Sequence, residues 1–267
     1  MELTTILGCI VGVIAVVGAM IFKKISFTVF LNPAAFFVIF VGTVATILNS
    51  FPGKNLKNIG TLFKILFTKQ KLISEEEIIK LMIGLALEAR KEGLLALEGK
   101  LETIDDAFIK KGLRMVIDGM TEEDISDILG VEISAMQERH ELNASIFSSA
   151  GMYAPTLGVL GAVFGLIAAM GHINDTALMS EAIAAAFIAT ILGIFTGYVL
   201  WNPFAKKLKV KSQTEVQLKS MAVEGILSIQ SGDSPVIVQE KLLSMLSETD
   251  QAKMLNELNQ GNQSNQG

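Results

Sequence analysis

Side chains that could carry acid–base, nucleophilic or metal chemistry are few in this sequence. There is one cysteine, Cys9, and there are two histidines, His140 and His172. A single cysteine allows neither an internal disulfide nor a thiolate metal cluster, and two histidines make a zinc site hard to assemble. We therefore expect no bound metal and no cofactor.

Four stretches contain no aspartate, glutamate, lysine, arginine or histidine at all. They are residues 3–22, 25–53, 142–171 and 182–205. None contains a Ser–His, paired-carboxylate or His–Glu arrangement, so we predict that the chain is not an enzyme. The neutral ligands left in these stretches are hydroxyls, such as those of Thr190 and Thr196, and backbone carbonyl groups.

Each stretch is long enough to cross a bilayer as a helix. About 20 helical residues span the ~30 Å hydrocarbon core, and open sheet edges are not tolerated in lipid. The sequence is 51% hydrophobic and 18% charged, whereas a soluble domain carries about 25% charge. We predict four transmembrane helices near residues 3–22, 30–50, 148–170 and 182–203. The net charge of −5 argues against nucleic acid as a partner.

The distribution of lysine and arginine predicts how the chain sits in the membrane. Residues 51–147 hold 13 of the 22 basic residues, and the link between the third and fourth spans holds none. Because cytoplasmic loops carry the excess of positive charge, the insert at 51–147 and the C-terminus are predicted to be cytoplasmic. Lys23 and Lys24 fall on the other side and oppose this orientation.

These features predict an all-α membrane protein with a large helical insert between its second and third spans. Its segments are transmembrane helices 1 and 2 (1–50), a cytoplasmic helical domain (51–147), transmembrane helices 3 and 4 (148–203) and cytoplasmic C-terminal helices with a disordered tail (204–267). Helix starts are predicted at Ser74–Glu77, Thr121–Asp124 and Ser234–Pro235, the last helix running to about Glu248. Residues 54–73 predict a basic amphipathic helix at the inner membrane surface, and 259–267 a disordered end.

The third and fourth spans carry small residues at helical spacing, which let two helix backbones approach closely. The two spans therefore line a packing seam, either with another subunit or within one chain. The seam residues are Gly158, Gly161, Gly165, Ala186, Gly193 and Gly197.

Two prolines interrupt the backbone hydrogen bonding of these spans. Pro155 cannot donate to the carbonyl of Gly151, and Pro203 cannot donate to that of Val199. In a bilayer a freed carbonyl needs a neighbour or water, so both prolines would face protein or a wet cavity. The alternative is that each proline lies near a helix end, and spacing alone favours this alternative.

The most informative feature is the absence of Asp, Glu, Lys, Arg and His from the predicted spans. Intramembrane carboxylates and histidines normally mark proton and ion relays. If this chain conducts ions, the titrating group must therefore come from a partner.

The sequence resembles the MotA/PomA stator family of the bacterial flagellar motor. The segments that carry the resemblance are APTLGVLGAVFG at 154–165 and AAAFIATILGIFTGYVLWNP at 184–203, together with the four-span layout. The match covers nearly the whole chain up to about residue 250. The related TolQ/ExbB family shares the paired third- and fourth-helix pattern, but it has three spans with the insert after the first.

The resemblance implies a ring of five subunits in the bacterial inner membrane, around two copies of a MotB-type partner that supplies a transmembrane aspartate. Ion flow through that carboxylate would turn the ring against the rotor protein FliG. Pro155 and Pro203 match the family's functional prolines, and Thr190 matches the hydroxyl at the ion path. Ala162 stands where sodium-driven members have threonine, which favours protons over sodium as the transported ion.

The resemblance also assigns Arg90 and Glu98 to the rotor contact. On one continuous helix they would lie ~12 Å apart along the axis and roughly 80° apart around it, although Gly93 between them can break the helix. A solvated charged face is the alternative for these residues. For the whole chain, the alternatives are a TolQ/ExbB-like energiser of envelope processes without a rotor, and a non-conducting membrane scaffold.

Overall fold

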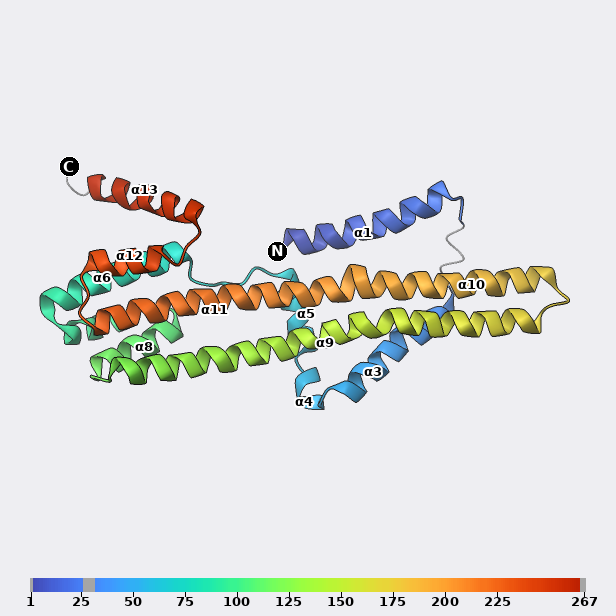
Figure 1. Cartoon of the computed structure of the whole chain (residues 1–267), viewed down its shortest axis with the longest axis horizontal. Helices are drawn as coiled ribbons and strands as arrows, with labels where there is room; N and C mark the ends of the chain where they lie inside the picture. Colours follow the sequence, from blue (N-terminus) through green and yellow to red (C-terminus); the bar gives the residue numbers. More distant parts are fainter. Residues whose placement is uncertain (1, 26–31, 265–267) are drawn as a thin grey trace. The chain divides into compact units, whose positions relative to one another are not determined.

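The computed structural model describes residues 2–25 and 32–264, with residues 259–264 as backbone only. Every regular element in this part of the chain is a helix (Figure 1). Four helices are long and apolar enough to cross a membrane: Leu3–Phe22, Pro33–Ser50, Glu122–Gly171 and Thr176–Gln230. The predicted all-α fold with four membrane helices is therefore confirmed.

The first two membrane helices lie where the apolar stretches predict them. Helix α1 covers Leu3–Phe22. The second is built from α2 (Pro33–Phe36), a π-helix η2 (Phe37–Val41) and α3 (Gly42–Ser50). Its start is fixed locally, because the side chain of Asn32 accepts a 3.1 Å bond from the N–H of Ala35 and is followed by proline. Residues 30–31 of the predicted span lie outside the described residues.

The third and fourth membrane helices are much longer than the predicted spans. Helix α9 covers Glu122–Gly171, and α10 (Thr176–Phe195), the π-helix η4 (Thr196–Trp201) and α11 (Asn202–Gln230) follow one another without a break. Pro155 and Pro203 therefore lie inside long helices, so the interpretation that they mark helix ends was wrong. Prolines are tolerated there because neighbouring groups and π-type adjustments satisfy the freed backbone groups.

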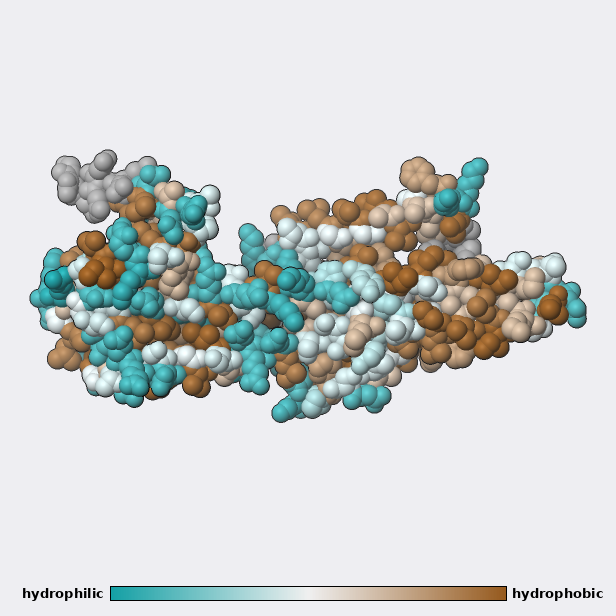
Figure 2. All heavy atoms as spheres, in the orientation of Figure 1, coloured by the Kyte–Doolittle hydropathy of each residue, from teal (hydrophilic) through white to brown (hydrophobic). Residues whose placement is uncertain are grey.

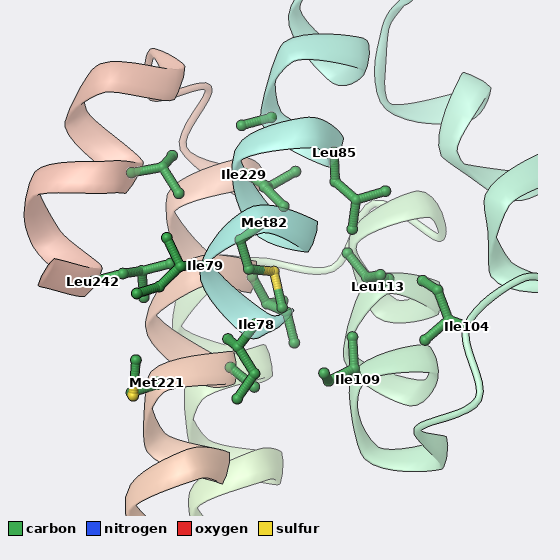
Figure 3. Close-up of a cluster of buried hydrophobic side chains, with 14 of the residues drawn as sticks. Ile78, Ile79, Met82, Leu85, Ile104, Ile109, Leu113, Met221, Ile229 and Leu242 are labelled. Atoms are coloured by element: carbon green, nitrogen blue, oxygen red, sulfur yellow. The ribbon is translucent and has the colours of Figure 1, made fainter. Parts of the chain in front are cut away.

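The chain forms two compact units. We call residues 1–70 and 139–211 the membrane unit, and residues 71–138 and 212–267 the polar unit. Besides parts of α9 and α11, the polar unit contains α6 (Glu75–Glu92), the 3₁₀ helix η3 (Leu94–Leu97), α7 (Glu98–Leu101), α8 (Ala107–Ile117), α12 (Pro235–Leu243) and α13 (Glu248–Ser264). Figure 3 shows side chains of its core, where Ile78, Met82 and Leu113 are fully buried.

Local capping explains where the helices of the polar unit begin. The hydroxyl of Ser74 accepts from the N–H of Glu77, whose carboxylate accepts in return from the N–H of Ser74 at 2.8 Å. The bonds that the N–H and the hydroxyl of Ser74 donate to the carboxylate hold the pKa of Glu77 below its usual value. The Thr121 hydroxyl caps α9 by accepting from the N–H of Asp124, and the Ser234 hydroxyl caps α12 by accepting from the N–H of Ile237. All three predicted helix starts are confirmed.

Helix ends differ more from the predictions. Helix α12 ends at Leu243 rather than near residue 248, and α13 continues to Ser264, into the end predicted to be disordered. Burial of Met254 in the polar-unit core anchors α13, a tertiary effect that the polar composition of the tail conceals. The basic amphipathic segment 54–73 is also not one helix, since it splits into α4 (Gly53–Leu56) and α5 (Ile59–Phe67).

An ionic cluster joins three helices of the membrane unit. The carboxylate of Glu2 lies 3.0 Å from the ammonium groups of both Lys207 and Lys211 on α11. Lys211 also donates to the carbonyls of Ile65 and Thr68 at 2.7 Å, so α5 is held as well. Hydrogen bonds from Lys207 and Lys211, in that order, hold the pKa of Glu2 below its usual value of 4.5.

We predict that Glu2→Gln lowers thermal stability at neutral pH by roughly 1–2 kcal/mol, because two partly buried ammonium groups lose their anion. A depressed carboxyl pKa stabilises the folded state above about pH 4.5, and this contribution disappears as the pH falls through the folded value. The difference from the unmodified chain should therefore vanish in acid. Melting of the detergent-solubilised protein between pH 3 and 7 measures it.

Glu141→Gln is the matched control, because that carboxylate is 69% exposed and lies 3.8 Å from Lys209. An exposed ion pair contributes little, so the control should melt like the unmodified chain. A Glu2→Gln deficit that persists unchanged at pH 3 would contradict an ionic origin.

Candidate functional site

Helices α9 and α10 approach each other so closely that several positions of their contact have room only for glycine, which has no Cβ atom. A Cβ atom at Gly158 would lie 2.8 Å from the carbonyl oxygen of Ala189 and 3.0 Å from the Cα of Gly193. A Cβ at Gly193 would lie 2.7 Å from the carbonyl oxygen of Ala154. Such separations bring Cα–H groups against carbonyl oxygens, a recurring feature of close helix pairs.

The remaining predicted seam residues extend this contact along both helices. A Cβ at Gly165 would meet the Cβ of Ala186 at 2.8 Å, and one at Gly161 would meet the Cβ of Ala189 at 3.0 Å. The structure therefore places the small-residue seam inside one chain, between α9 and α10. Of the two alternatives left open by the sequence, packing within the chain is the one present here.

Pro155 packs against Gly197 at the same contact. A Cβ at Gly197 would lie 2.7 Å from the Cγ of the Pro155 ring and 2.8 Å from the carbonyl oxygen of Gly151. That carbonyl is the one that Pro155 deprives of its α-helical donor. Protein therefore covers the freed group, as expected for a proline inside a membrane helix.

Asn202 is a residue of this site that the sequence analysis did not single out. Its side-chain amide packs directly on Gly151, where a Cβ would fall 2.6 Å from the Cγ of Asn202. The sequence feature that could have indicated Asn202 is its position immediately before Pro203. In the structure it directly follows the π-helix η4. Pro203 itself is exposed on α11. Proline and a π turn are two of the common causes of local helix irregularity, and here they are adjacent.

The two threonine hydroxyls have different surroundings. The hydroxyl of Thr196 is buried and donates to the carbonyls of Leu192 and Gly193 at 2.8 and 3.2 Å. Thr190 is half-buried, and its hydroxyl donates to the carbonyl of Ala186 at 3.3 Å. Since a hydroxyl has two acceptor lone pairs, Thr190 can still accept a bond from an incoming group. Ala162 is also half-buried, and its neighbour Gly161 contacts the neighbour of Thr190, Ala189.

The faces of α9 and α10 that point away from the seam are apolar and exposed. Figure 2 shows hydrophobic surface over these helices. The exposed side chains recur at helical spacing and include Val159, Val163, Met170, Phe187, Ile194 and Tyr198. A polar environment would not tolerate such faces, so they require lipid or other apolar protein surfaces.

Arg90 and Glu98 do not share a helix. Arg90 lies in the last turn of α6, which ends at Gly93 with φ +87°, and Glu98 begins α7. Of the two alternatives that the sequence left open, the helix break at Gly93 is the one present, because glycine at positive φ turns the chain between the two residues. Both side chains are exposed, and a 3.5 Å ion pair between Glu88 and Lys100 connects the two helices beside them.

The structure gives no candidate metal centre in the residues that it describes, because no three His, Cys, Asp or Glu side chains gather there. His172 lies exposed in the turn after α9, where its N–H donates to the carbonyl of Ala169. The seam therefore offers close backbone contact, one proline at the contact, Pro155, and the half-buried hydroxyl of Thr190.

We predict that Gly197→Ala disrupts the membrane unit, because the new methyl group would collide with Pro155 and the Gly151 carbonyl. Overpacking of this kind typically costs about 1–3 kcal/mol. Gly8→Ala on α1 is the control, since its Cβ would meet nothing within 4 Å. Melting curves in detergent should show a loss for Gly197→Ala alone, and equal curves for both variants would disprove the tight contact.

Comparisons with known proteins place this arrangement in a family. A profile of the MotA/TolQ/ExbB proton channel family matches residues 100–221. Motility protein A of Bacillus subtilis is 48% identical over 253 residues, covering 95% of this chain and 94% of the relative. The flagellar MotAB stator complex from Bacillus subtilis contains a chain that superposes with a TM-score of 0.88 at 48% identity, covering 94% of this chain and 98% of its own length. A chain of C. jejuni MotAB gives a TM-score of 0.87 at 30% identity, covering 93% and 97%. The predicted resemblance is confirmed, and the chain belongs to the MotA/TolQ/ExbB proton channel family, among the motility protein A sequences.

Proposed function

We propose that this chain is a flagellar stator subunit that forms an ion channel with a MotB-type partner and converts ion flow into torque. The observation that carries the proposal is a closely packed pair of helices, α9 and α10, with no Asp, Glu, Lys, Arg or His in their predicted spans. Such helices can enclose an ion path but cannot relay a proton themselves. The related solved structures are MotAB complexes, which agrees with a second subunit.

The partner's transmembrane aspartate would be the titrating group. The exposed apolar faces of α9 and α10 offer a surface for its helix, and the Thr190 hydroxyl can accept a bond from the protonated carboxyl group. When the aspartate loses its proton, burial against an apolar lining becomes costly, and the carboxylate favours a wetter position. Proton occupancy would then select between two positions of the partner relative to the ring. The ring of five subunits about two partner chains is the arrangement that the family resemblance implies.

The coupling ion in this proposal is a proton. Ala162 supplies no oxygen, so Thr190 is the accessible side-chain hydroxyl at this level of the seam. A sodium ion would need several oxygen ligands to replace its hydration shell, whereas a proton needs only an acceptor on its route. Sodium is the alternative that ion-replacement experiments would test.

The proposed location is the bacterial inner membrane, with the insert and the C-terminus in the cytoplasm. Thirteen basic residues of the insert support this orientation. The ionic cluster of Glu2 with Lys207 and Lys211 places the start of α1 on the same membrane face as α5. Lys23 and Lys24 then lie at the opposite face.

The rotor contact would lie in the polar unit. Arg90 and Glu98 are exposed on adjacent helices, so they can meet complementary charges on FliG even though no single helix carries them. Charges at the rim of an interface tune orientation and encounter rate more than affinity. The four-span layout favours this function over a TolQ/ExbB-like energiser without a rotor.

The decisive experiment measures ion flow into liposomes. The chain reconstituted with its MotB-type partner should acidify the vesicle interior under a proton gradient, and replacing the partner's transmembrane aspartate by asparagine should abolish the flow. Vesicles that contain this chain alone should show no proton flow. Rapid proton flow through the chain alone would overturn the proposal, and a complex that never conducts would favour the scaffold hypothesis.

We predict that Thr190→Val weakens proton flow and swimming by about tenfold while the complex still assembles, since one hydroxyl is lost from an almost isosteric side chain. Thr190→Ser keeps the hydroxyl and should retain most of the flow. Size-exclusion chromatography checks assembly, and liposome assays check conduction. Undiminished flow through Thr190→Val would remove this hydroxyl from the ion path.

For the rotor contact, we predict that Arg90→Glu and Glu98→Lys each reduce swimming several-fold with proton flow unchanged. Arg114→Glu is the control, because Arg114 is an exposed arginine on another helix of the polar unit, α8. Swim-plate diameters and liposome assays on the same variants separate torque from conduction. Loss of proton flow in the Arg90 or Glu98 variants would point instead to a folding defect.

A further inference from the structure

The membrane unit contains an apolar groove that its own side chains do not fill. The groove has a volume of about 310 Å³, within the roughly 300–1,000 Å³ typical of ligand sites. It lies between α3, α5, the middle of α9 and the end of η4. Its lining includes Val44, Ile47, Leu56, Phe63, Phe147 and Trp201.

The lining leaves almost nothing for a polar ligand to bind. Every lining side chain apart from Thr43 is aliphatic or aromatic, and the Thr43 hydroxyl already donates to the carbonyl of Ile39 at 2.6 Å. On its open side the groove is bounded by exposed side chains of α3, with Val44 57% and Leu48 62% accessible. An occupant must therefore be apolar along its length.

Two lysines lie close in sequence to one lining residue of this apolar groove. Lys57 directly follows Leu56, which lines the groove, Lys54 lies two residues before it, and both lysines are exposed. The sequence has no acidic residue between Glu2 and Glu75, and neither lysine pairs with a carboxylate of the described residues. Two unneutralised ammonium groups beside an apolar slot are complementary to a molecule with an anionic head and a hydrocarbon tail.

We propose that this groove binds one anionic phospholipid, with an acyl chain between α3 and α5 and its phosphate at Lys54 and Lys57. The site lies where hydrocarbon gives way to the headgroup layer, as the adjacent Trp201 and the basic helices α4 and α5 indicate. The bound acyl chain would fill the space beside the cluster of edge-on and tilted rings of Phe63, Phe147 and Trp201, whose centroids lie 5.2–6.4 Å apart. It would thus brace α5 against α9 independently of ion flow.

A second copy of this chain is the competing occupant. In a ring a neighbouring copy would meet the groove with a different face of the chain. It would explain the apolar lining, but it would pair with the two lysines only if that face carried carboxylates, and the four uncharged stretches carry none. Charge complementarity therefore favours lipid over protein here.

Trp201 makes the proposal testable without any mutation, since it is the chain's single tryptophan and lines the groove. The full-length chain is reconstituted in vesicles in which either phosphatidylglycerol or phosphatidylcholine carries brominated acyl chains. Bromine quenches indole fluorescence on contact. We expect quenching by brominated phosphatidylglycerol at about tenfold lower lipid fraction, because two lysines contribute to binding the anionic head.

Paired variants separate the two halves of the site. Lys54→Gln with Lys57→Gln should remove the preference for phosphatidylglycerol, whereas Lys23→Gln with Lys24→Gln, the same charge loss elsewhere, should keep it. Val44→Phe should block the acyl slot and abolish the selective quenching. Val41→Phe, on the same membrane helix but outside the lining, should not. Leu48→Phe repeats the steric test if Val44→Phe does not fold.

Equal quenching by the two lipids in the unmodified chain would overturn the proposal. So would a preference that survives both Lys54→Gln with Lys57→Gln and the steric variant. If Trp201 is shielded from both brominated lipids and Val44→Phe breaks the oligomer apart, the occupant is a second copy, and the lipid site does not exist.

Discussion

The close approach of α9 to α10 is the contact on which the rest of the membrane unit depends. Within lipid the hydrophobic effect does not drive helices together, so association relies on dispersion and on weak backbone contacts that need very short separations. Gly158, Gly193 and Gly197 make these separations possible by presenting no side chain to the opposite backbone. The bulky apolar residues are consequently displaced to the outer faces, where lipid or other apolar surfaces must cover them.

Charged side chains, in contrast to the apolar ones, are confined to the ends of the membrane helices. Glu2, Lys207 and Lys211 form a partly buried cluster that ties α1 and α5 to α11, and its hydrogen bonds use the hydroxyls and carbonyls left free at helix ends. This arrangement keeps Asp, Glu, Lys, Arg and His out of the predicted spans. In such a neutral interior, the carboxylate of the proposed partner would dominate the local electrostatics.

Some of these features could be predicted from the sequence because their causes are local. Long uncharged stretches gave the four spans, and the Ser74–Glu77 pattern gave the start of α6. Other features depend on tertiary contacts: α13 persists because Met254 is buried, and both helices continue through Pro155 and Pro203 because neighbouring groups and a π turn accommodate them.

The sequence could not distinguish a seam inside the chain from one between subunits, since small residues allow close helix packing in both cases. Gly93 indicated where the helix could break between Arg90 and Glu98, and its backbone φ of +87° shows that the helix does break there.

The irregular backbone features of α9 and α10 converge on one short region. Pro155, Gly197, the π-helix η4 and the Asn202–Pro203 pair contact one another directly or follow in sequence. Because the surrounding spans contain no Asp, Glu, Lys, Arg or His, we expect the response of this chain to a passing ion to be a change of geometry rather than of its own charge. The proline and the π turn remove regular backbone hydrogen bonds, so this region is where the tightly packed helix pair can change its geometry most readily. The same segment leads without a break into α11, which begins in the membrane unit and continues into the polar unit.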